Sequence, residues 1–351
     1  MIKRFKNLGR VRKKAYSGSA LIIAIWTIAL LSLLVMSFAF DSHLESKVMS
    51  FARKRRKAEY LATSGFTIAQ MLLDKQRSVT GNEAPESTAT DRWYKPALQL
   101  SHGLPVLGLT DNLGEGIIRL DIEPEPGRRN VNLLLDDSWE RILEIGGVPE
   151  EYWPELIDSF ADWTDSDSVP RNDGGETDDY YATRENPYKA RNGPIETVRE
   201  LLLVKGFNEA IVSGGVLNPE SEADQQIVLS GIQDMLTTYG DGKVNVNAAS
   251  MRVLMTLPGV DDLAARAIIE ERERKELDDN GNEKDGAFVS AQDFISRVPD
   301  IDPGVQNMIT TRSNVFKITA VGQVGRATRR IWAIVDLAGD KVRVLRWREE
   351  P

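Results

Sequence analysis

An uncharged stretch near the N-terminus constrains this chain more than any other feature. Residues 19–40 read SALIIAIWTIALLSLLVMSFAF and contain no charged side chain. As a helix, this stretch extends about 33 Å, which is enough to cross the hydrocarbon core of a bilayer. Its length and its continuous apolar character favour a transmembrane helix over a buried core helix, which is rarely apolar on every side.

Basic residues before the span predict its orientation. Residues 1–18 carry seven Lys or Arg side chains and no acid. We therefore expect the N-terminus to stay in the cytoplasm and the body to lie on the other side of the inner membrane, which is the periplasm if the cell is a diderm bacterium. A cleaved secretory signal is the competing interpretation, but such a signal has a shorter apolar region. The helix is predicted to continue to about residue 74, because residues 41–74 lack Pro and repeat apolar residues at helical spacing.

The rest of the chain is acidic, and this limits its possible functions. The 351 residues have a formal net charge of −9, and without the seven N-terminal positive charges the remainder has −16. A body of this charge argues against a large phosphate-binding face. Cys is absent, and His43 and His102 are the two His residues. A Cys–His catalytic pair is therefore impossible, and a Ser–His pair could use only one of these two histidines. For this reason we expect no enzyme.

The remaining pattern predicts a small antiparallel sheet and a helical middle region. Residues 77–114 are rich in turn formers and read as a loop. Residues 133–300 read as short helices between turn signals. Alternating or continuous apolar residues predict four strands, at Gly116–Ile122, Val315–Val321, Arg329–Leu337 and Val342–Trp347.

The helical middle region contains an internal repeat. The sequence Asn-Val-Asn occurs at 130–132 and at 245–247, each time before a helix, a Gly-containing turn and a second helix. Each unit resembles a helix-hairpin-helix motif, which leaves a membrane-tethered DNA-binding protein as the alternative function. However, Asp261 and Asp262 follow the second turn, and acids at a helix start would repel a phosphate. Structural packing of the helices is the favoured interpretation.

The richest chemical feature is an acidic loop between Asp162 and Asp179. Seven carboxylates lie within these residues, together with Gly, Asn and Ser. Such a cluster is either solvated or bridged by a cation, and calcium prefers six to eight hard oxygen ligands. The calcium candidates are Asp162, Asp165, Asp167, Asp173, Glu176, Asp178 and Asp179, and a weaker second set is Asp278, Asn280 and Asn282.

These features together resemble the general secretion pathway protein K family, the large minor pseudopilins of type II secretion systems. Residues 162–167 are similar to the family's DWxDxD segment, and residues 174–180 to its GxEDxxY stretch. Thr177 departs from the latter, because the family often has an acid there. Residues 187–201 resemble the PYxxxNxPxxxxxEL segment, and residues 245–247 match its NVN.

The N-terminus carries the same resemblance. Gly18 and Ser19 look like the family's prepilin-peptidase site, which implies cleavage of a leader between them. Most pilins have Glu at the fifth mature position, whereas this chain has Ile23 there. An uncharged residue at this position is typical of the K family and suits a subunit with no neighbour ahead of it.

The resemblance implies an α+β fold of the pilin-like type, in which a long N-terminal helix and a small antiparallel sheet carry a large, mostly α-helical insertion. It implies a calcium cofactor and a place at the pseudopilus tip with the minor pseudopilins I and J. Other pseudopilins, the inner-membrane assembly platform, the prepilin peptidase and membrane lipid are further expected partners, and nucleic acid is not. The expected divisions are a leader at 1–18, a span at 19–40, a pilin-like core at 75–130 and 310–351, and an insertion at 131–309.

Overall fold

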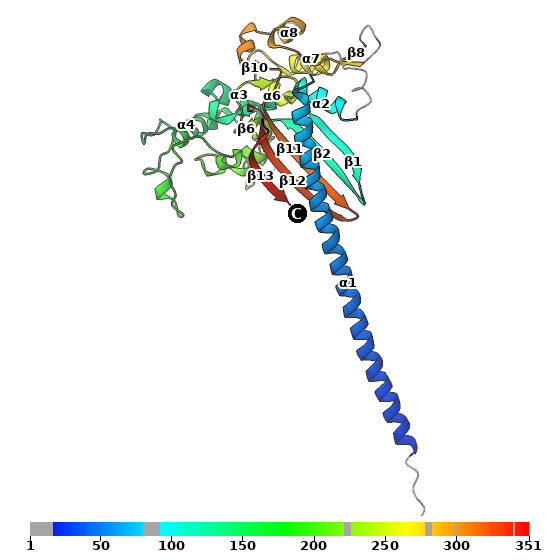
Figure 1. Cartoon of the computed structure of the whole chain (residues 1–351). Coiled ribbons are helices and arrows are strands. Elements are labelled where there is room, and N and C mark those ends of the chain that lie inside the picture. The colour runs from blue at the N-terminus through cyan, green and yellow to red at the C-terminus, as the bar shows by residue number, and fades with distance from the viewer. Residues whose placement is uncertain are drawn as a thin grey trace, which may run out of the picture. The chain divides into compact units, whose positions relative to one another are not determined.

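The structure is a computed structural model, shown in Figure 1. The chain divides into two compact units, with the boundary between Lys57 and Ala58. The predicted candidates Asp278, Asn280 and Asn282 lie outside the described residues, as does most of the expected leader. The described residues are 17–79, 92–220, 226–277, 283–298, 301–339 and 341–350.

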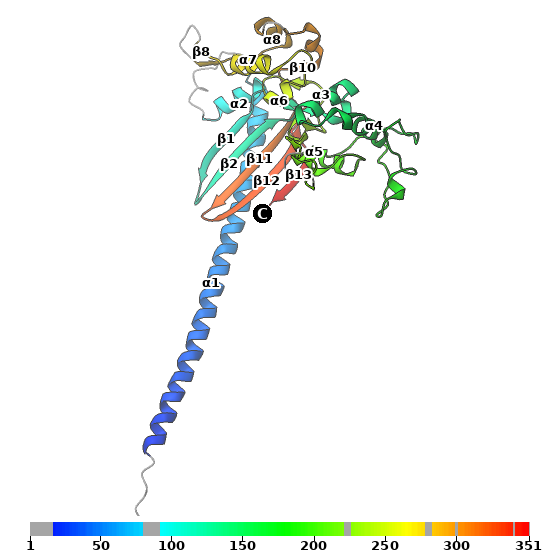
Figure 2. The ribbon, with the colours of Figure 1, turned by 180° about the vertical axis from the view of Figure 1, so that it is seen from behind.

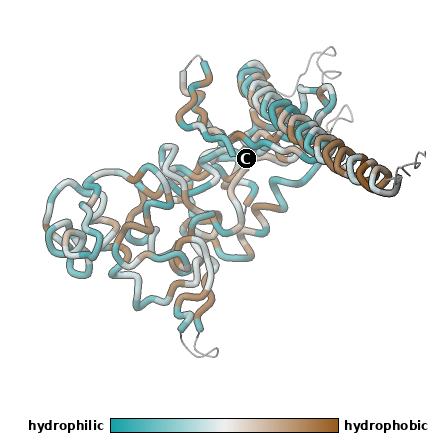
Figure 3. Tube along the Cα trace, turned by 90° about the horizontal axis from the view of Figure 1, so that it is seen from below, coloured by the Kyte–Doolittle hydropathy of each residue, from teal (hydrophilic) through white to brown (hydrophobic). Residues whose placement is uncertain are grey.

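One long helix, α1 (Ser17–Gln76), contains the apolar span and confirms the helix predicted to about residue 74. By length and composition, it can cross a membrane. Its residues 19–40 are exposed, with Ile23 exposed at 62%, and they form the long brown stretch of the helix in Figure 3. Because so much exposed apolar surface is unfavourable in water, this stretch requires lipid or apolar protein around it.

In the second unit, α1 from Ala58 onward packs on one face of an antiparallel sheet. The contact depends on glycine. A Cβ added to Gly322 would lie 2.1 Å from the carbonyl oxygen of Ala58, and a Cβ added to Gly65 would lie 2.8 Å from the Ile118 side chain. The helix and the sheet therefore approach each other more closely than a larger residue at either position would allow.

The sheet has the order β1-β2-β11-β12-β13, with every neighbouring pair antiparallel. On its inner face, Ile318 lies opposite Ile122 and Ala333, and all three are fully buried. The four predicted strands are confirmed with small changes in their ends. The strands are β1 (Val106–Leu113), β2 (Gly116–Pro124), β11 (Val315–Val324), β12 (Ala327–Asp336) and β13 (Arg343–Glu350).

The prediction of a loop over residues 77–114 was wrong in its second half. This region contains α2 (Tyr94–Ser101) and the strand β1. The helix has only eight residues and includes Pro96, and β1 is a sheet edge that exposes most of its side chains. An edge strand with polar residues at Thr110 to Asn112 lacks the apolar alternation on which the sequence prediction relied.

Between β2 and β11 the chain forms a second hydrophobic core, separate from the core under α1. Its helices are α3 (Asp136–Gly146), α4 (Trp153–Thr164), α5 (Glu209–Ser213), α6 (Met251–Leu254), α7 (Asp262–Glu273) and α8 (Ala291–Arg297). Its strand pairs are β3 (Arg129–Asn130) with β6 (Leu236–Thr237), β4 (Gly215–Val216) with β5 (Val228–Leu229), β7 (Val244–Asn245) with β10 (Ile309–Thr310), and β8 (Lys275–Leu277) with β9 (Glu283–Asp285). Short 3₁₀ helices lie at Glu125–Gly127, Val131–Leu133, Glu150–Tyr152, Tyr181–Thr183, Val198–Leu203, Gln233–Met235 and Pro303–Met308.

The two Asn-Val-Asn units use the same hydrogen bonds. In the first unit, Asn132 exchanges two side-chain hydrogen bonds with the backbone of Ile195, at 2.8 and 3.0 Å. In the second, Asn247 exchanges two with the backbone of Phe288, at 2.9 and 2.8 Å. Each pair joins the start of a unit to the segment after its acidic loop. An Asn amide can both donate and accept, which explains why the two units share this residue.

The insertion leaves the sheet at the end where α1 terminates. It begins after Pro124, which pairs with Phe316 at the start of β11. The end of α1 lies there too, because Arg77, the residue after α1, donates a hydrogen bond to the carbonyl oxygen of Leu337, just after β12. Figure 1 shows the insertion around this end of the sheet.

Candidate functional site: an acidic cluster in the insertion

The acidic loop begins at the C-terminus of α4, which the second core holds in place. Phe160 and Trp163 of α4 are buried in that core. The loop starts at Asp165, whose backbone N–H ends the helix by donating to the carbonyl oxygen of Ala161. A helix C-terminus carries partial negative charge. Carboxylates gathered there are therefore repelled by the helix as well as by one another, and a cation would relieve both repulsions.

Asp162 organises the loop from beneath. Its side chain is fully buried, and its carboxylate accepts backbone N–H groups from Arg171, at 3.1 Å, and from Gly175, at 2.8 Å. A Cβ at Gly174 would lie 1.9 Å from one of the carboxylate oxygens, so this position requires glycine. Burial raises the pKa of Asp162, although the two backbone hydrogen bonds oppose the shift. The carboxylate thus folds the loop back onto α4.

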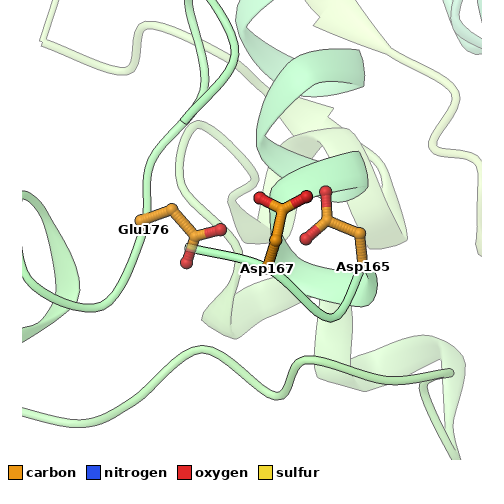
Figure 4. Close-up of side chains that lie close together, drawn as sticks. All are labelled: Asp165, Asp167 and Glu176. Atoms are coloured by element: carbon orange, nitrogen blue, oxygen red, sulfur yellow. The ribbon is translucent and has the colours of Figure 1, made fainter. Parts of the chain in front are cut away.

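Three of the predicted carboxylates meet in one place. Ligand oxygens of Asp165, Asp167 and Glu176 all lie within 4.8 Å of one another. Figure 4 shows the Glu176 carboxylate directed toward the two aspartates. Glu176 is only 2% exposed, and neither its Oε1 nor the Oδ1 of Asp165 has a hydrogen-bond donor among the described residues. Buried acceptors without donors are costly, and hard oxygens in this arrangement fit a divalent cation such as calcium.

The structure places the other described candidates outside this cluster. Asp173, Asp178 and Asp179 are exposed. The side chain of Asp179 accepts the backbone N–H of Glu176 at 2.7 Å, which positions Glu176. Asp173 contributes backbone contacts instead, because its N–H donates to Asp158 at 3.1 Å. These groups shape the loop around the cluster.

A lysine that the sequence did not point to closes the loop. The ammonium group of Lys205 donates to the carbonyl oxygens of Asp173, at 2.9 Å, and of Gly174, at 2.7 Å. It also lies 5.4 Å from the centre of the Tyr180 ring. Lys205 follows the 3₁₀ helix Val198–Leu203 in an ordinary turn, so no sequence signal connects it to the acidic loop.

The segments that carried the family resemblance converge on the same place. Asn192 has a positive φ of 49° and donates its amide to the carbonyl oxygen of Asp167 at 2.9 Å. Its backbone N–H reaches the carbonyl oxygen of Trp163 at 3.0 Å. The Trp163 indole in turn donates to Glu200 at 3.3 Å. Thr177, where the family often has an acid, accepts the backbone N–H of Ala190 at 2.9 Å. The segments 162–167, 174–180 and 187–201 are therefore joined by hydrogen bonds around the acidic cluster.

The cluster predicts a dependence of stability on pH in the cation-free protein. Burial raises the pKa of Asp165 and of Glu176, and the charge of Asp167 adds to the shift at Asp165. The folded state then holds these protons more tightly than the unfolded chain does. Their stabilising contribution is complete below the unfolded pKa of about 4 and is lost as pH rises through the raised folded values. Thermal denaturation in chelator should show this loss of stability over that pH interval.

The matched control for this experiment is the double variant Asp165→Asn with Glu176→Gln. It keeps the shape of the cluster but removes both titrating groups. The pH dependence should become shallower in this variant. An identical pH profile for the two proteins would assign the change to other carboxyl groups.

At the second hairpin turn, the described residues provide no comparable site for phosphate. Asp261 caps α7 by accepting the N–H of Ala264 at 2.8 Å. Asp262 forms an ion pair with Arg266 at 2.8 Å, so the nearby positive charge of Arg266 is already neutralised. The acids at this turn stabilise the start of α7, as the sequence predicted, and they oppose phosphate binding there.

Comparison with known proteins places these features in context. A family model described as type II secretion system (T2SS), protein K, matches residues 126–214, which include the acidic loop. The type II secretion system protein K of Pseudomonas aeruginosa is 26% identical over 307 residues, covering 84% of this chain and 81% of the relative.

A solved structure also matches. It is the crystal structure of the GspK-GspI-GspJ complex from the enterotoxigenic Escherichia coli type 2 secretion system. The alignment covers 89% of this chain and 99% of the matched chain, with a TM-score of 0.55 and 15% sequence identity. The match confirms the expected α+β fold.

Proposed function

We propose that this chain is a minor pseudopilin, homologous to type II secretion system protein K, and that it works at the tip of the pseudopilus. There it initiates or caps assembly and so supports export of folded proteins across the outer membrane. The observation that carries this proposal is the insertion, which is attached at the sheet end where α1 terminates. In a fibre held together by its N-terminal helices, bulk at that end of a subunit leaves little room for another subunit beyond it.

The apolar segment supports the same position. Residues 19–40 of α1 are exposed and uncharged, so they suit a single pass through the inner membrane before assembly and helix–helix packing after it. The basic residues that precede the span would keep the N-terminus in the cytoplasm and the body in the periplasm. Ile23 needs no charged partner from a subunit ahead of it, which fits the first subunit of the fibre.

The proposed partners are the minor pseudopilins I and J of the same secretion system. The matched Escherichia coli structure is a complex of GspK with GspI and GspJ, and a protein K homologue would assemble in the corresponding way. Co-expression of this chain with its system's I and J subunits should yield a stable ternary complex on size-exclusion chromatography in detergent. Elution of the chain apart from both subunits would contradict this assignment. Other pseudopilins, the assembly platform and the prepilin peptidase would be encountered along the same route.

Processing of the leader gives a separate prediction. Cleavage by a prepilin peptidase between Gly18 and Ser19 should produce a mature protein that begins at Ser19, and mass spectrometry of the N-terminal peptide measures this directly. Gly18→Val should block the reaction and leave the basic leader attached, whereas the neighbouring Ser17→Ala serves as the control and should be processed. A mature wild-type protein that retains Met1 would contradict the prediction.

Calcium is the cofactor of this proposal, held by Asp165, Asp167 and Glu176. The fit rests on the unpartnered oxygens of Asp165 and Glu176 and on three hard donors that lie together. A bound calcium ion would supply positive charge to the loop and to the C-terminus of α4. Its role would be structural, because it would fix the loop that joins α4 to the segments carrying Asn192 and Lys205.

A further inference from the structure

An open groove lies between the insertion and the sheet face opposite α1. Its volume is about 800 Å³, and its sheet side is formed by outward-facing residues of β11, β12 and β13, among them Trp332 and Arg346. Its other side includes Ser213 of α5 and Arg252 of α6. Figure 2 views this face of the sheet, with α5 beside β12 and β13.

The groove is basic although the chain is acidic. Seven of its lining residues are Arg or Lys and four are Asp or Glu, while the whole chain has a net charge of −9. On the insertion side the charges are matched: Arg252 pairs with Asp234 at 2.5 Å, and Arg128 pairs with Glu125 at 3.1 Å. The excess positive charge therefore lies on the sheet side.

On the sheet side, three arginines line the groove together with a single carboxylate, which contacts two of them. Arg330 and Arg348 lie 3.6 and 3.7 Å from Glu350, and their side chains are 56% and 64% exposed. The Trp332 indole also donates to Glu350, at 3.1 Å. The Arg346 guanidinium lies 5.6 Å from the centre of the Trp332 ring and has no ion pair among the described residues. Two positive charges thus remain uncompensated beside an aromatic surface.

We propose that this groove binds an acidic, extended segment of a partner polypeptide. The uncompensated arginines provide the attraction for carboxylates. The sheet order places β13 at an edge, so its outer backbone groups can pair with an added strand whose alternate side chains reach the arginines. The proposal goes beyond the role in the pseudopilus and does not depend on it, because it rests on the groove alone.

A polypeptide fits this groove better than a nucleic acid. Glu196 and Asp234 lie on the insertion side, and a continuous phosphate backbone would meet both of them. A peptide with spaced acidic side chains can direct these side chains toward the arginines of the sheet. Its backbone N–H groups can then face Glu196 and Asp234 on the insertion side.

Fluorescence anisotropy tests the proposal with the full chain in detergent. The probe is a short fluorescein-labelled peptide of alternating Glu and Val, and its counterpart carries Lys in place of Glu. The Glu peptide should bind and the Lys peptide should not. Arg346→Glu with Arg348→Glu should weaken binding by about tenfold or more, and added salt should weaken binding to the wild type.

The matched control is Arg119→Glu with Arg326→Glu. It changes the net charge equally, and Arg119 lies on the same sheet face but outside the groove. This variant should bind the Glu peptide as the wild type does, and thermal denaturation should show both variants folded. If the reversed pair disturbs folding, Arg346→Gln with Arg348→Gln provides the same comparison with a smaller expected loss. Failure of the wild type to bind the Glu peptide, equal binding by the two double variants, or tighter binding of a single-stranded oligonucleotide would overturn the proposal.

Discussion

Glu176→Gln should weaken calcium binding about a hundredfold, which corresponds to roughly 2.7 kcal/mol. The glutamate is 2% exposed and one of its oxygens has no hydrogen-bond donor among the described residues, so a bound cation would be its main partner. Glutamine keeps the shape but removes the charge, and the buried position gives water little access to replace the lost ligand. Changes to residues that merely support metal ligands already cost tenfold to a hundredfold.

The control for this variant is Asp178→Asn. It removes the same charge from the same loop, and the sequence alone ranked Asp178 equally with Glu176. The structure places Asp178 outside the cluster and exposed, so its amide variant should bind calcium nearly as well as the wild type. Isothermal titration calorimetry on both variants gives the comparison. Equal weakening in the two would mean that overall loop charge, and not the three-residue cluster, holds the ion.

Gly322→Ala should destabilise the second unit by about 3 kcal/mol. The new methyl group would lie 2.1 Å from the carbonyl oxygen of Ala58 and 2.6 Å from the backbone nitrogen of Ala62. Both are backbone atoms of α1, which cannot rotate away as the end of a flexible side chain could. The helix must therefore move off the sheet and lose contacts in its buried face.

Circular dichroism during heating measures this effect. For a unit of this size, the loss corresponds to a decrease in melting temperature of about 5 °C. Gly339→Ala is the control, because a Cβ at Gly339 would meet nothing within 4 Å. A melting temperature of Gly322→Ala equal to that of the control would show that α1 does not depend on this close contact.

The sequence predicted the parts of the fold that have a strong periodic signal. The uncharged run beginning at Ser19 required a long apolar helix, and the β-branched segments near the C-terminus required strands. It did not predict β1, because an edge strand with polar residues such as Asp111 and Asn112 lacks apolar alternation. Apolar alternation in a sequence arises when one face of a strand is buried. Most side chains of β1 are exposed, so its sequence shows no such alternation.

The candidate site shows a different limit. Composition located the acidic loop, because seven carboxylates in a short segment are unusual in any sequence. Composition could not separate Asp162, which accepts backbone N–H groups, from Glu176, which has an unpartnered oxygen. That difference depends on the path of the backbone after α4. Lys205 and Asn192 were missed for a similar reason, because only the folded chain brings them to the loop.

We propose that secretion depends on this chain acting as a minor pseudopilin. The direct measurement is the distribution of a substrate of the same secretion system between periplasm and medium, in cells with and without this chain. The substrate should stay in the periplasm when the chain is absent, and the wild-type chain should return it to the medium. Undiminished export of the substrate in cells that lack the chain would contradict a role for this chain in secretion.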